Sequence, residues 1–279
     1  MAGGGVQRVG TIDEIGAPQR AAILDEIIAA QRRRRRWFRG QFVLVWIVLV
    51  GIVGVFLWSA GRVSWEFIFT SGPYILGGAG VTILVSAVAM VMAIGLALLG
   101  ALGRLSVNAI FNAVASLYVS LVRGTPLLVQ IWFIFYALPQ ADIVLDAIPA
   151  GIIALGFNYG AYMTEIFRAG IQAVPRSQRE AAQALGLPER LVFRRIVLPQ
   201  AVRIVIPAIG NDFVAMIKDS ALVSVIAIQE LLWRATRVGR SERQLLAAIA
   251  IAAVVYWILT IIFSYFQDKL EKRMARGDR

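Results

Sequence analysis

The side chains of this sequence exclude most enzyme chemistry. The chain has 279 residues with no Cys and no His. This composition excludes disulfides, thiol nucleophiles, Cys/His zinc sites and imidazole acid–base catalysis. The phosphate-binding loop sequence G-x-x-x-x-G-K-[ST] is also missing. We therefore expect no catalytic residue and no metal site in this chain.

The charged residues are densest between positions 168 and 203, a segment that we call the charged island. Seven arginines stand there against Glu180 and Glu189: Arg168, Arg176, Arg179, Arg190, Arg194, Arg195 and Arg203. This island separates two apolar segments, so it is a place where another protein can bind. From these residues alone, an ordinary loop lying on lipid headgroups is an equal alternative.

The first half of the island predicts a short helix over Ser177–Leu185, which is rich in Ala. Ser177 precedes Glu180 by three residues, the spacing of a capping box. Gly186 can adopt the left-handed conformation that ends a helix. Small side chains on this helix leave room for a partner to approach closely: Ala181, Ala182 and Ala184.

The second half of the island predicts another short helix over Glu189–Val197. Pro188 suits its first turn, and Pro199 is expected to end it before the next apolar segment. The island should therefore consist of two short helices joined by a sharp bend.

The segments that hold the island are long and apolar. Hydrophobic residues make up 59% of the chain and the mean hydropathy is +0.73, values typical of a membrane protein. A helix needs about 20 apolar residues to cross the bilayer core. We expect about six spans, at 42–60, 72–103, 105–141, 147–164, 204–229 and 244–267.

The basic residues indicate an orientation rather than a nucleic-acid partner. The formal net charge is +11, but the bases flank apolar spans, as in the cytoplasmic loops of membrane proteins. Arg32–Arg36 and Arg39 precede the first span, and Lys269, Lys272, Arg273 and Arg276 follow the last. Both termini and the island should therefore be cytoplasmic. We expect no nucleic acid and a contact with membrane lipids.

The N-terminal residues do not resemble a signal peptide, because the segment before the first span is too long. Residues 1–41 form a basic segment that is either an amphipathic helix on the membrane surface or a partly disordered tail. Residues 42–60 are expected to be a transmembrane helix.

Polar residues inside the third and fourth spans are candidates for a translocation path. Gly124 and Pro126 predict a bend, while Arg123 either lines a path or extends to headgroups. Asn158 and Tyr162 share a helix face and serve either a path or helix–helix hydrogen bonds. A structural ion pair is expected between Glu165 and Arg168.

The fifth span carries Asn211, Asp212, Lys218 and Asp219. We expect structural ion pairs from the charged residues to neighbouring helices rather than substrate contact.

Four arginines recur at every third position after this span: Arg234, Arg237, Arg240 and Arg243. They could dock an acidic face of an extracellular binding protein or attract an anionic substrate. The alternative is a solvated loop.

One motif of the island resembles a known family. The order Glu180-Ala181-Ala182, three residues, Gly186, nine residues, Ile196-x-Leu198-Pro199 resembles the EAA loop of ABC importer permeases. Residues 123–130 (RGTPLLVQ), 160–168 (GAY-x-x-E-x-x-R) and 218–226 resemble the polar amino acid branch of that family. The resemblance covers roughly residues 73–270, with Ser220-Ala221-Leu222 where the family often has Thr-Ser-Leu.

The resemblance implies an all-α membrane protein with a five-helix type I importer core and one extra N-terminal helix. The permease domain would span 72–268, with the coupling loop at 168–203 and a basic cytoplasmic tail at 269–279. It would lie in the cell membrane and carry polar amino acids such as histidine, glutamine or glutamate. The path residues would be Arg123, Gly124, Thr125, Pro126, Asn158, Tyr162 and Asn211.

The resemblance also implies the partners. Two cytoplasmic ATPase subunits would bind the coupling residues Glu180, Ala181, Ala182, Gly186, Ile196, Leu198 and Pro199. ATP and Mg would be bound by those subunits, so this chain would hold no cofactor and would not be an enzyme by itself. A second permease and an extracellular or periplasmic amino acid-binding protein complete the assembly. The alternatives are an ion-coupled secondary amino acid transporter and a membrane anchor without transport.

Overall fold

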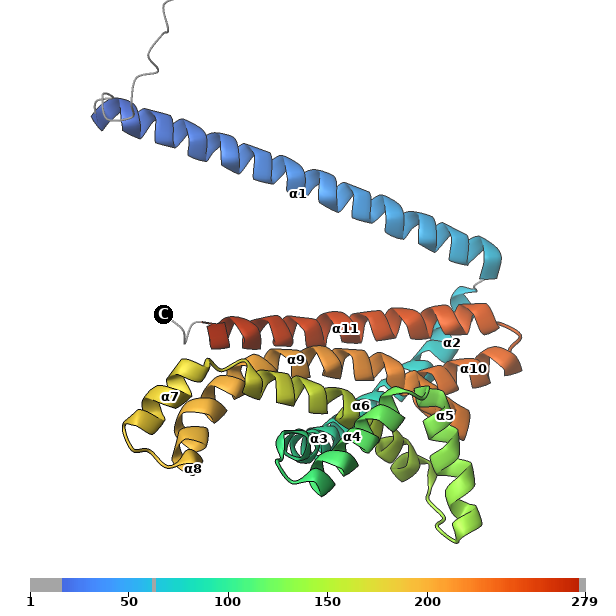
Figure 1. Ribbon diagram of the computed structural model, residues 1–279. Helices are drawn as coiled ribbons and strands as arrows, with labels where there is room; N and C mark the ends of the chain where they lie inside the picture. The colour runs from blue at the N-terminus through green and yellow to red at the C-terminus, as the bar shows by residue number, and fades with distance from the viewer. Residues whose placement is uncertain (1–16, 62–63, 276–279) are drawn as a thin grey trace, which may run out of the picture. The chain divides into compact units, whose positions relative to one another are not determined.

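The computed structural model describes residues 17–61 and 64–275 as helices and connecting turns, with no strand within those ranges (Figure 1). Residues 1–16, 62–63 and 276–279 lie outside the described residues, and with them parts of the predicted N-terminal segment and tail. The chain divides into two units, Met1–Ala60 and Gly61–Arg279, and each is described by itself.

The first unit contains all but the last residue of the helix α1 (Ala17–Gly61), which has 45 residues. The helix runs without a break from residue 17 through the arginine run and the apolar stretch that follows it. Residues 17–41 are therefore helical rather than partly disordered. The stretch Ile28–Phe56 is long and apolar enough to cross a membrane.

The second unit contains the remaining helices. In chain order these are α2 (Trp65–Leu76), α3 (Gly78–Leu105), α4 (Ala109–Arg123), α5 (Leu127–Trp132) with the π-turn η2 (Phe133–Ala137) and the 3₁₀ turn η3 (Leu138–Ala141), α6 (Ala147–Gln172), α7 (Arg176–Ala184), α8 (Glu189–Val192) with the π-turn η4 (Phe193–Val197), α9 (Leu198–Asp219) with the 3₁₀ turn η5 (Ser220–Ile226), α10 (Leu231–Ser241) and α11 (Leu245–Ala275). Within this unit α9 and α11 run side by side, and α7 and α8 lie at the opposite end from α10 (Figure 1).

The core of the second unit is the contact between α3 and α6. Small side chains line it, because Ala89, Ala93 and Ala97 of α3 are fully buried. Gly100 of α3 lies against Thr164 of α6 so closely that a methyl group there would collide with the Thr164 hydroxyl. Small residues let helix backbones approach in a membrane, where lipid supplies no hydrophobic drive for association.

Length and composition alone support three or four spans within the described residues. Ile28–Phe56, Trp65–Leu105 and Leu245–Met274 each qualify, and α4 together with Leu127–Ala141 qualifies as one bent span. The predicted count of six spans is reached only if α6 and α9 also cross the membrane. These helices have 26 and 22 residues and carry the polar side chains described below.

The predicted third span is not one straight helix. The axes of α4 and of Leu127–Ala141 differ by 107°, which confirms the bend expected at Gly124–Pro126. Pro126 lacks an N–H and disfavours helical geometry at the residue before it. The Gln130 side chain donates to the carbonyls of Val122 (2.7 Å) and Thr125 (3.1 Å), so the break leaves these two acceptors satisfied.

The α3–α6 contact generates a stability prediction. Gly100→Val should destabilise the protein by about 1–3 kcal/mol, because the added side chain has no space against Thr164. Gly95→Val in the same helix is the control, since a methyl group at Gly95 meets nothing within 4 Å. Thermal unfolding in detergent should show a lower midpoint for Gly100→Val alone. Equal midpoints for the two variants would contradict the close packing.

Candidate functional site

A polar pocket lies among α5, α6, α9 and η5. Its volume is about 350 Å³, at the lower end of the roughly 300–1,000 Å³ of small-molecule sites. It is lined by Thr125, Pro126, Leu127, Asn158, Tyr159, Tyr162, Asp212, Ala215, Asp219 and Leu222. Four of the seven predicted path residues therefore meet in one place: Thr125, Pro126, Asn158 and Tyr162.

The helix α6 contributes the polar wall of this pocket. Asn158 is buried, and its amide donates to Gln130 Oε1 over 3.1 Å. Gln130 is the residue that also satisfies the carbonyls at the break before α5. A continuous chain of hydrogen bonds therefore connects the pocket to the bend of the broken span.

Arg123 has a partner that sequence reasoning did not anticipate. Its guanidinium lies over the ring of Tyr162, 5.1 Å from the ring centroid, in a cation–π contact. The bend at Gly124 and Pro126 brings the two together, although they are 39 positions apart in the sequence. Arg123 is exposed and stands beside a ring that lines the pocket.

Two carboxylates of α9 face the same pocket. Asp212 and Asp219 are seven residues apart, which is close to two helical turns, so they share a helix face. The Tyr159 hydroxyl donates to Asp219 Oδ2 over 2.7 Å. Oδ2 of Asp212 is buried and has no hydrogen-bond partner among the described residues.

This geometry corrects the expectation of structural ion pairs in α9. Over residues 17–61 and 64–275, no ion pair involves Asp212, Lys218 or Asp219. Lys218 is exposed, whereas both carboxylates line the pocket. Asn211 does not line the pocket, because its Oδ1 accepts from Gln267 Nε2 of α11 over 2.7 Å.

The expected ion pair of α6 is confirmed and is part of a larger network. Arg168 Nη2 lies 2.7 Å from Glu165 Oε2, and Arg104 Nε of α3 lies 3.2 Å from Glu165 Oε1. Arg104 also donates to Ser116 of α4. Sequence reasoning missed Arg104, because it is 61 residues from Glu165 and no spacing rule relates them. The network joins α3, α4 and α6 at the start of the charged island.

The charged island folds as two short helices around a sharp bend, as predicted. Gly186 has φ +76°, a left-handed conformation, and its N–H donates to the Gln183 carbonyl. The predicted capping box of Ser177 and Glu180 is absent. The helix α7 begins at Arg176 with Pro175 as its N-cap and has no side-chain cap, so Ser177 already lies within the first turn. Arg179 donates to the carbonyl of Ile171, near the end of α6, over 2.6 Å.

Pro199 does not end the second helix, which corrects another expectation. The chain passes from α8 through η4 directly into α9. In η4 the N–H of Leu198 donates to the carbonyl of Phe193, five residues back. A π-turn contains one residue more than an α-helical turn. Pro199 therefore lies in the first turn of α9, where its missing N–H is tolerated.

The predicted coupling residues separate into an inner and an outer set. Ala182 is buried and Ile196 packs beside it in a cluster with Ile171, Val174, Val192, Val197 and Ala201. Ala182 thus holds the island together rather than leaving room for a partner. The outer set is exposed: Glu180, Ala181, Gly186, Leu198 and Pro199. Leu185, which the motif does not include, is 82% exposed at the tip of the bend.

The four arginines beyond α9 do not act alike. Arg234 donates to the carbonyls of Tyr74 (3.2 Å) and Gln229 (3.0 Å) and stacks on the Tyr74 ring, so it joins α10 to α2. Arg237 stacks on Trp233. Arg240 and Arg243 are exposed, and Arg243 lies beyond the end of α10.

Sequence reasoning also missed the buried carboxylate of Glu230. It caps α10 by accepting from the N–H of Trp233 over 2.7 Å, and it accepts from the Tyr256 hydroxyl of α11. From the sequence we expected no helix over Leu231–Ser241, so there was no helix N-terminus at which an acidic residue would be favoured.

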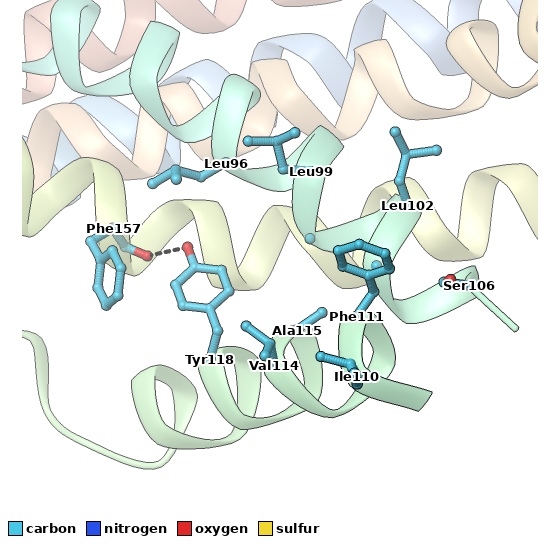
Figure 2. Close-up of a pocket in the computed structure, with 12 residues that line it drawn as sticks. Leu96, Leu99, Leu102, Ser106, Ile110, Phe111, Val114, Ala115, Tyr118 and Phe157 are labelled. Carbon is cyan, nitrogen blue, oxygen red and sulfur yellow. Dashed lines mark hydrogen bonds between the residues drawn. The ribbon is translucent and has the colours of Figure 1, made fainter. Parts of the chain in front are cut away.

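A second and larger pocket has a different character. It lies among α3, α4 and α6, has a volume of about 720 Å³ and is lined almost entirely by apolar side chains. Figure 2 shows Tyr118 of α4 pointing across it, where its hydroxyl donates to the Phe157 carbonyl over 2.7 Å. A pocket of this composition suits hydrocarbon and not a charged substrate, so the polar pocket is the better candidate path.

Comparison with known proteins gives a consistent result. Residues 93–276 match the family described as "Binding-protein-dependent transport system inner membrane component". The chain is 39% identical over 216 residues to the L-cystine transport system permease protein TcyB of Bacillus subtilis, covering 77% of this chain and 92% of the relative. It is 33% identical over 207 residues to the arginine transport system permease protein ArtQ of the same organism, covering 74% and 94%. A putative glutamine transport system permease protein of Rickettsia typhi is 35% identical over 202 residues, covering 72% and 93%.

Solved structures of ABC transporters align with this chain. The crystal structure of an amino acid ABC transporter with histidines aligns with a TM-score of 0.72 at 35% identity, covering 76% of this chain and 99% of the other. An inward-facing structure of the methionine transporter MetNI aligns with a TM-score of 0.57 at 15% identity, covering 76% and 99%, and shares the fold. None of the relatives named here is an ion-coupled carrier.

The bend of the island gives a local prediction. Gly186→Ala should cost about 1–2 kcal/mol, because a residue with a Cβ is strained at φ +76°. Gly72→Ala is the control, since Gly72 has open space around it and no positive φ. Hydrogen exchange should accelerate at residues 182–187 in Gly186→Ala and nowhere in the control. Unchanged exchange in both variants would rule out a strained turn.

Proposed function

This chain belongs to the family of binding-protein-dependent transport system inner membrane components, and from that we propose that it is the permease subunit of an ABC importer that moves polar L-amino acids into the cell. The observation that carries the proposal is the EAA motif of the charged island, whose outer set is exposed beyond the end of α6. The relatives named for cystine, arginine and glutamine transport support an amino acid substrate.

The helix α6 supports a mechanical link between the island and the pocket. It runs unbroken from Ala147 to Gln172 and carries Asn158 in the pocket. Fourteen residues separate Asn158 from the end of the helix, about 21 Å at 1.5 Å per residue. A displacement of the island is passed to the pocket, because α6 is one continuous helix and Arg179 is bonded to its last turn.

The partners follow from this arrangement. Two cytoplasmic ATPase subunits bind the islands of two permeases, which form a homodimer or a heterodimer. The contact residues are the outer set with Leu185, while Ala182 and Ile196 keep the two island helices packed. ATP and Mg are held by the ATPases, so this chain binds no cofactor and hydrolyses nothing itself. Closure of the ATPases moves the islands and switches the path between inward-open and outward-open states.

We assign the termini and the island to the cytoplasmic side, because Lys and Arg are concentrated in these segments and cytoplasmic segments of membrane proteins are enriched in them. α10, at the end of the second unit opposite the island, then faces outward (Figure 1). A substrate-binding protein delivers the amino acid to that side. Arg237, Arg240 and Arg243 are the arginines that remain exposed for docking it.

The island can be tested by reversing one charge. Glu180→Lys should lower the ATP hydrolysis rate of the reconstituted permease–ATPase complex, as stimulated by binding protein, by about tenfold or more, the effect of an interface hot spot. Asp142→Lys is the matched control, because Asp142 is also an exposed carboxylate but lies in the turn after η3, outside both the island and α10. If both variants retain wild-type hydrolysis and bind the ATPase normally, the island is not the coupling contact.

The outer arginines give a separate prediction. Arg240→Glu should raise the concentration of binding protein needed for half-maximal ATPase stimulation, and the difference from wild type should shrink at high salt, because exposed charges are screened. Arg234→Ala should instead lower the unfolding temperature, since Arg234 ties α10 to α2. A concentration dependence that Arg240→Glu does not alter would show that α10 is not the docking surface.

A further inference from the structure

The large apolar pocket among α3, α4 and α6 is a slot that is closed at one end, and we call it the α3–α4 slot. Figure 2 shows Leu96, Leu99 and Leu102 of α3 along one side and Ile110, Val114 and Tyr118 of α4 along the other. At the closed end the Tyr118 hydroxyl donates to the Phe157 carbonyl, and the two rings meet edge to face with centroids 4.8 Å apart. The opposite end is the turn at Ser106, between α3 and α4.

The slot has the length of one half of a bilayer core. Leu96 precedes the end of α3 at Leu105 by nine residues, about 14 Å at 1.5 Å per residue. Half of the hydrocarbon core of a membrane is about 15 Å thick. Apolar side chains along the slot are largely exposed, among them Ile110 and Val114. An extended acyl chain is therefore the occupant whose length and polarity match this shape.

The Ser106 end has the character of a membrane surface. Val107, the next residue in the turn, is apolar and fully exposed, while Ser106 and Asn108 on either side of it are polar. Such a mixture suits the boundary between lipid headgroups and lipid tails. A lipid whose tail lies in the slot would thus have its headgroup beside this turn.

This end of the slot also carries positive charge. Arg104, two residues before Ser106, bonds to Glu165 and keeps 30% of its side chain exposed. Arg168 bonds to the same carboxylate, so two arginines against one carboxylate leave a net charge of +1. Arginine is well suited to phosphate, because its planar guanidinium matches the phosphate oxygens. The charge at the mouth is complementary to an anionic headgroup.

The concave shape distinguishes this slot from an ordinary lipid-facing surface. Lipid tails are as apolar as the side chains of a span, so a flat helix face gains little from one particular lipid. A tail between two helices makes dispersion contacts on several sides at once. A cation at the mouth adds an attraction for anionic lipid.

We propose that the α3–α4 slot binds one acyl chain of an anionic phospholipid, from the leaflet on the side of the charged island, with its phosphate beside Arg104. The end of the chain lies against Tyr118. Phe157 closes the slot there and directly precedes Asn158 of the polar pocket. The bound tail thus packs between α3 and α4 and supports α6 from outside the polar pocket.

The test places the permease–ATPase complex in nanodiscs of phosphatidylethanolamine and phosphatidylglycerol. A trace of phosphatidylglycerol carries a photoreactive diazirine at the end of one acyl chain, and mass spectrometry locates the attached lipid after illumination. Labelling should concentrate at the closed end, on Leu96, Tyr118 and Phe157. A diazirine close to the glycerol should label Ser106 and Ile110 instead. Phosphatidylcholine with the terminal diazirine should label the closed end less, because its headgroup has no net charge.

A matched pair of variants tests the slot itself. Val114→Trp fills it and should reduce labelling of Tyr118 by about tenfold or more, because overpacking an occupied site costs at least the ~1.4 kcal/mol of a tenfold change. Leu117→Trp is the control, since Leu117 on the same helix is exposed to the same extent (67% against 64%) and is not among the residues that line the slot. Co-purification with the ATPase shows that each variant is folded. Ile110→Trp replaces Val114→Trp if the latter does not purify.

Three results would overturn the proposal. The first is labelling of Leu117 as strong as that of Tyr118, which indicates an ordinary lipid-facing surface. The second is labelling of Tyr118 that Val114→Trp leaves unchanged. The third is a second copy of the chain in the slot. Because the sequence has no Cys, Val114→Cys introduces the only thiol of this chain, and rapid oxidative cross-linking of two permeases through it would reveal that copy. None of these readouts requires transport, so the importer assignment does not depend on them.

Discussion

The close contact of α3 with α6 is the constraint on which the rest of the second unit depends. Residues with small side chains make this contact, among them Ala93 and Ala97, and Gly100 packs directly against Thr164. α6 is held by this contact along the stretch that also carries Asn158, Tyr159 and Tyr162. One helix thereby fixes a pocket wall in its middle and an attachment point for the island at its end. The salt-bridge network of Glu165 with Arg104 and Arg168 secures the same pair of helices near that end.

Irregular backbone occurs where the proposed function needs it. The break at Gly124–Pro126 turns the chain by 107° and places Thr125 and Pro126 in the pocket. The π-turn η4 lies within the island and leads directly into α9, which carries Asp212 and Asp219. π-turns and broken helices are common at functional sites, because they free backbone groups and redirect side chains. The two island helices thus lead, through α6 or through η4 and α9, to two helices that line the same pocket.

Much of this organisation could be predicted from the sequence. The bend at Gly124–Pro126, the left-handed Gly186 and the Glu165–Arg168 pair all follow from local rules about residue type and spacing. The placement of Asp212 and Asp219 in the polar pocket could not be predicted, because spacing places them on one face but does not say which neighbour that face meets. Asn211 adjoins Asp212 in sequence, yet it bonds to α11 instead. Pro199 was misjudged because a π-turn, which has no sequence signature, shifts the helical register ahead of it.

In the proposed function, ATP hydrolysed by partner subunits drives amino acid movement through this chain. The most direct measurement is uptake of a radiolabelled amino acid into proteoliposomes that contain the permease and its ATPase, with binding protein on the outside. The account predicts uptake that requires ATP inside the vesicles and binding protein outside, and that persists when ionophores dissipate proton and sodium gradients. Uptake that continues without ATP and stops with the ionophores would contradict it.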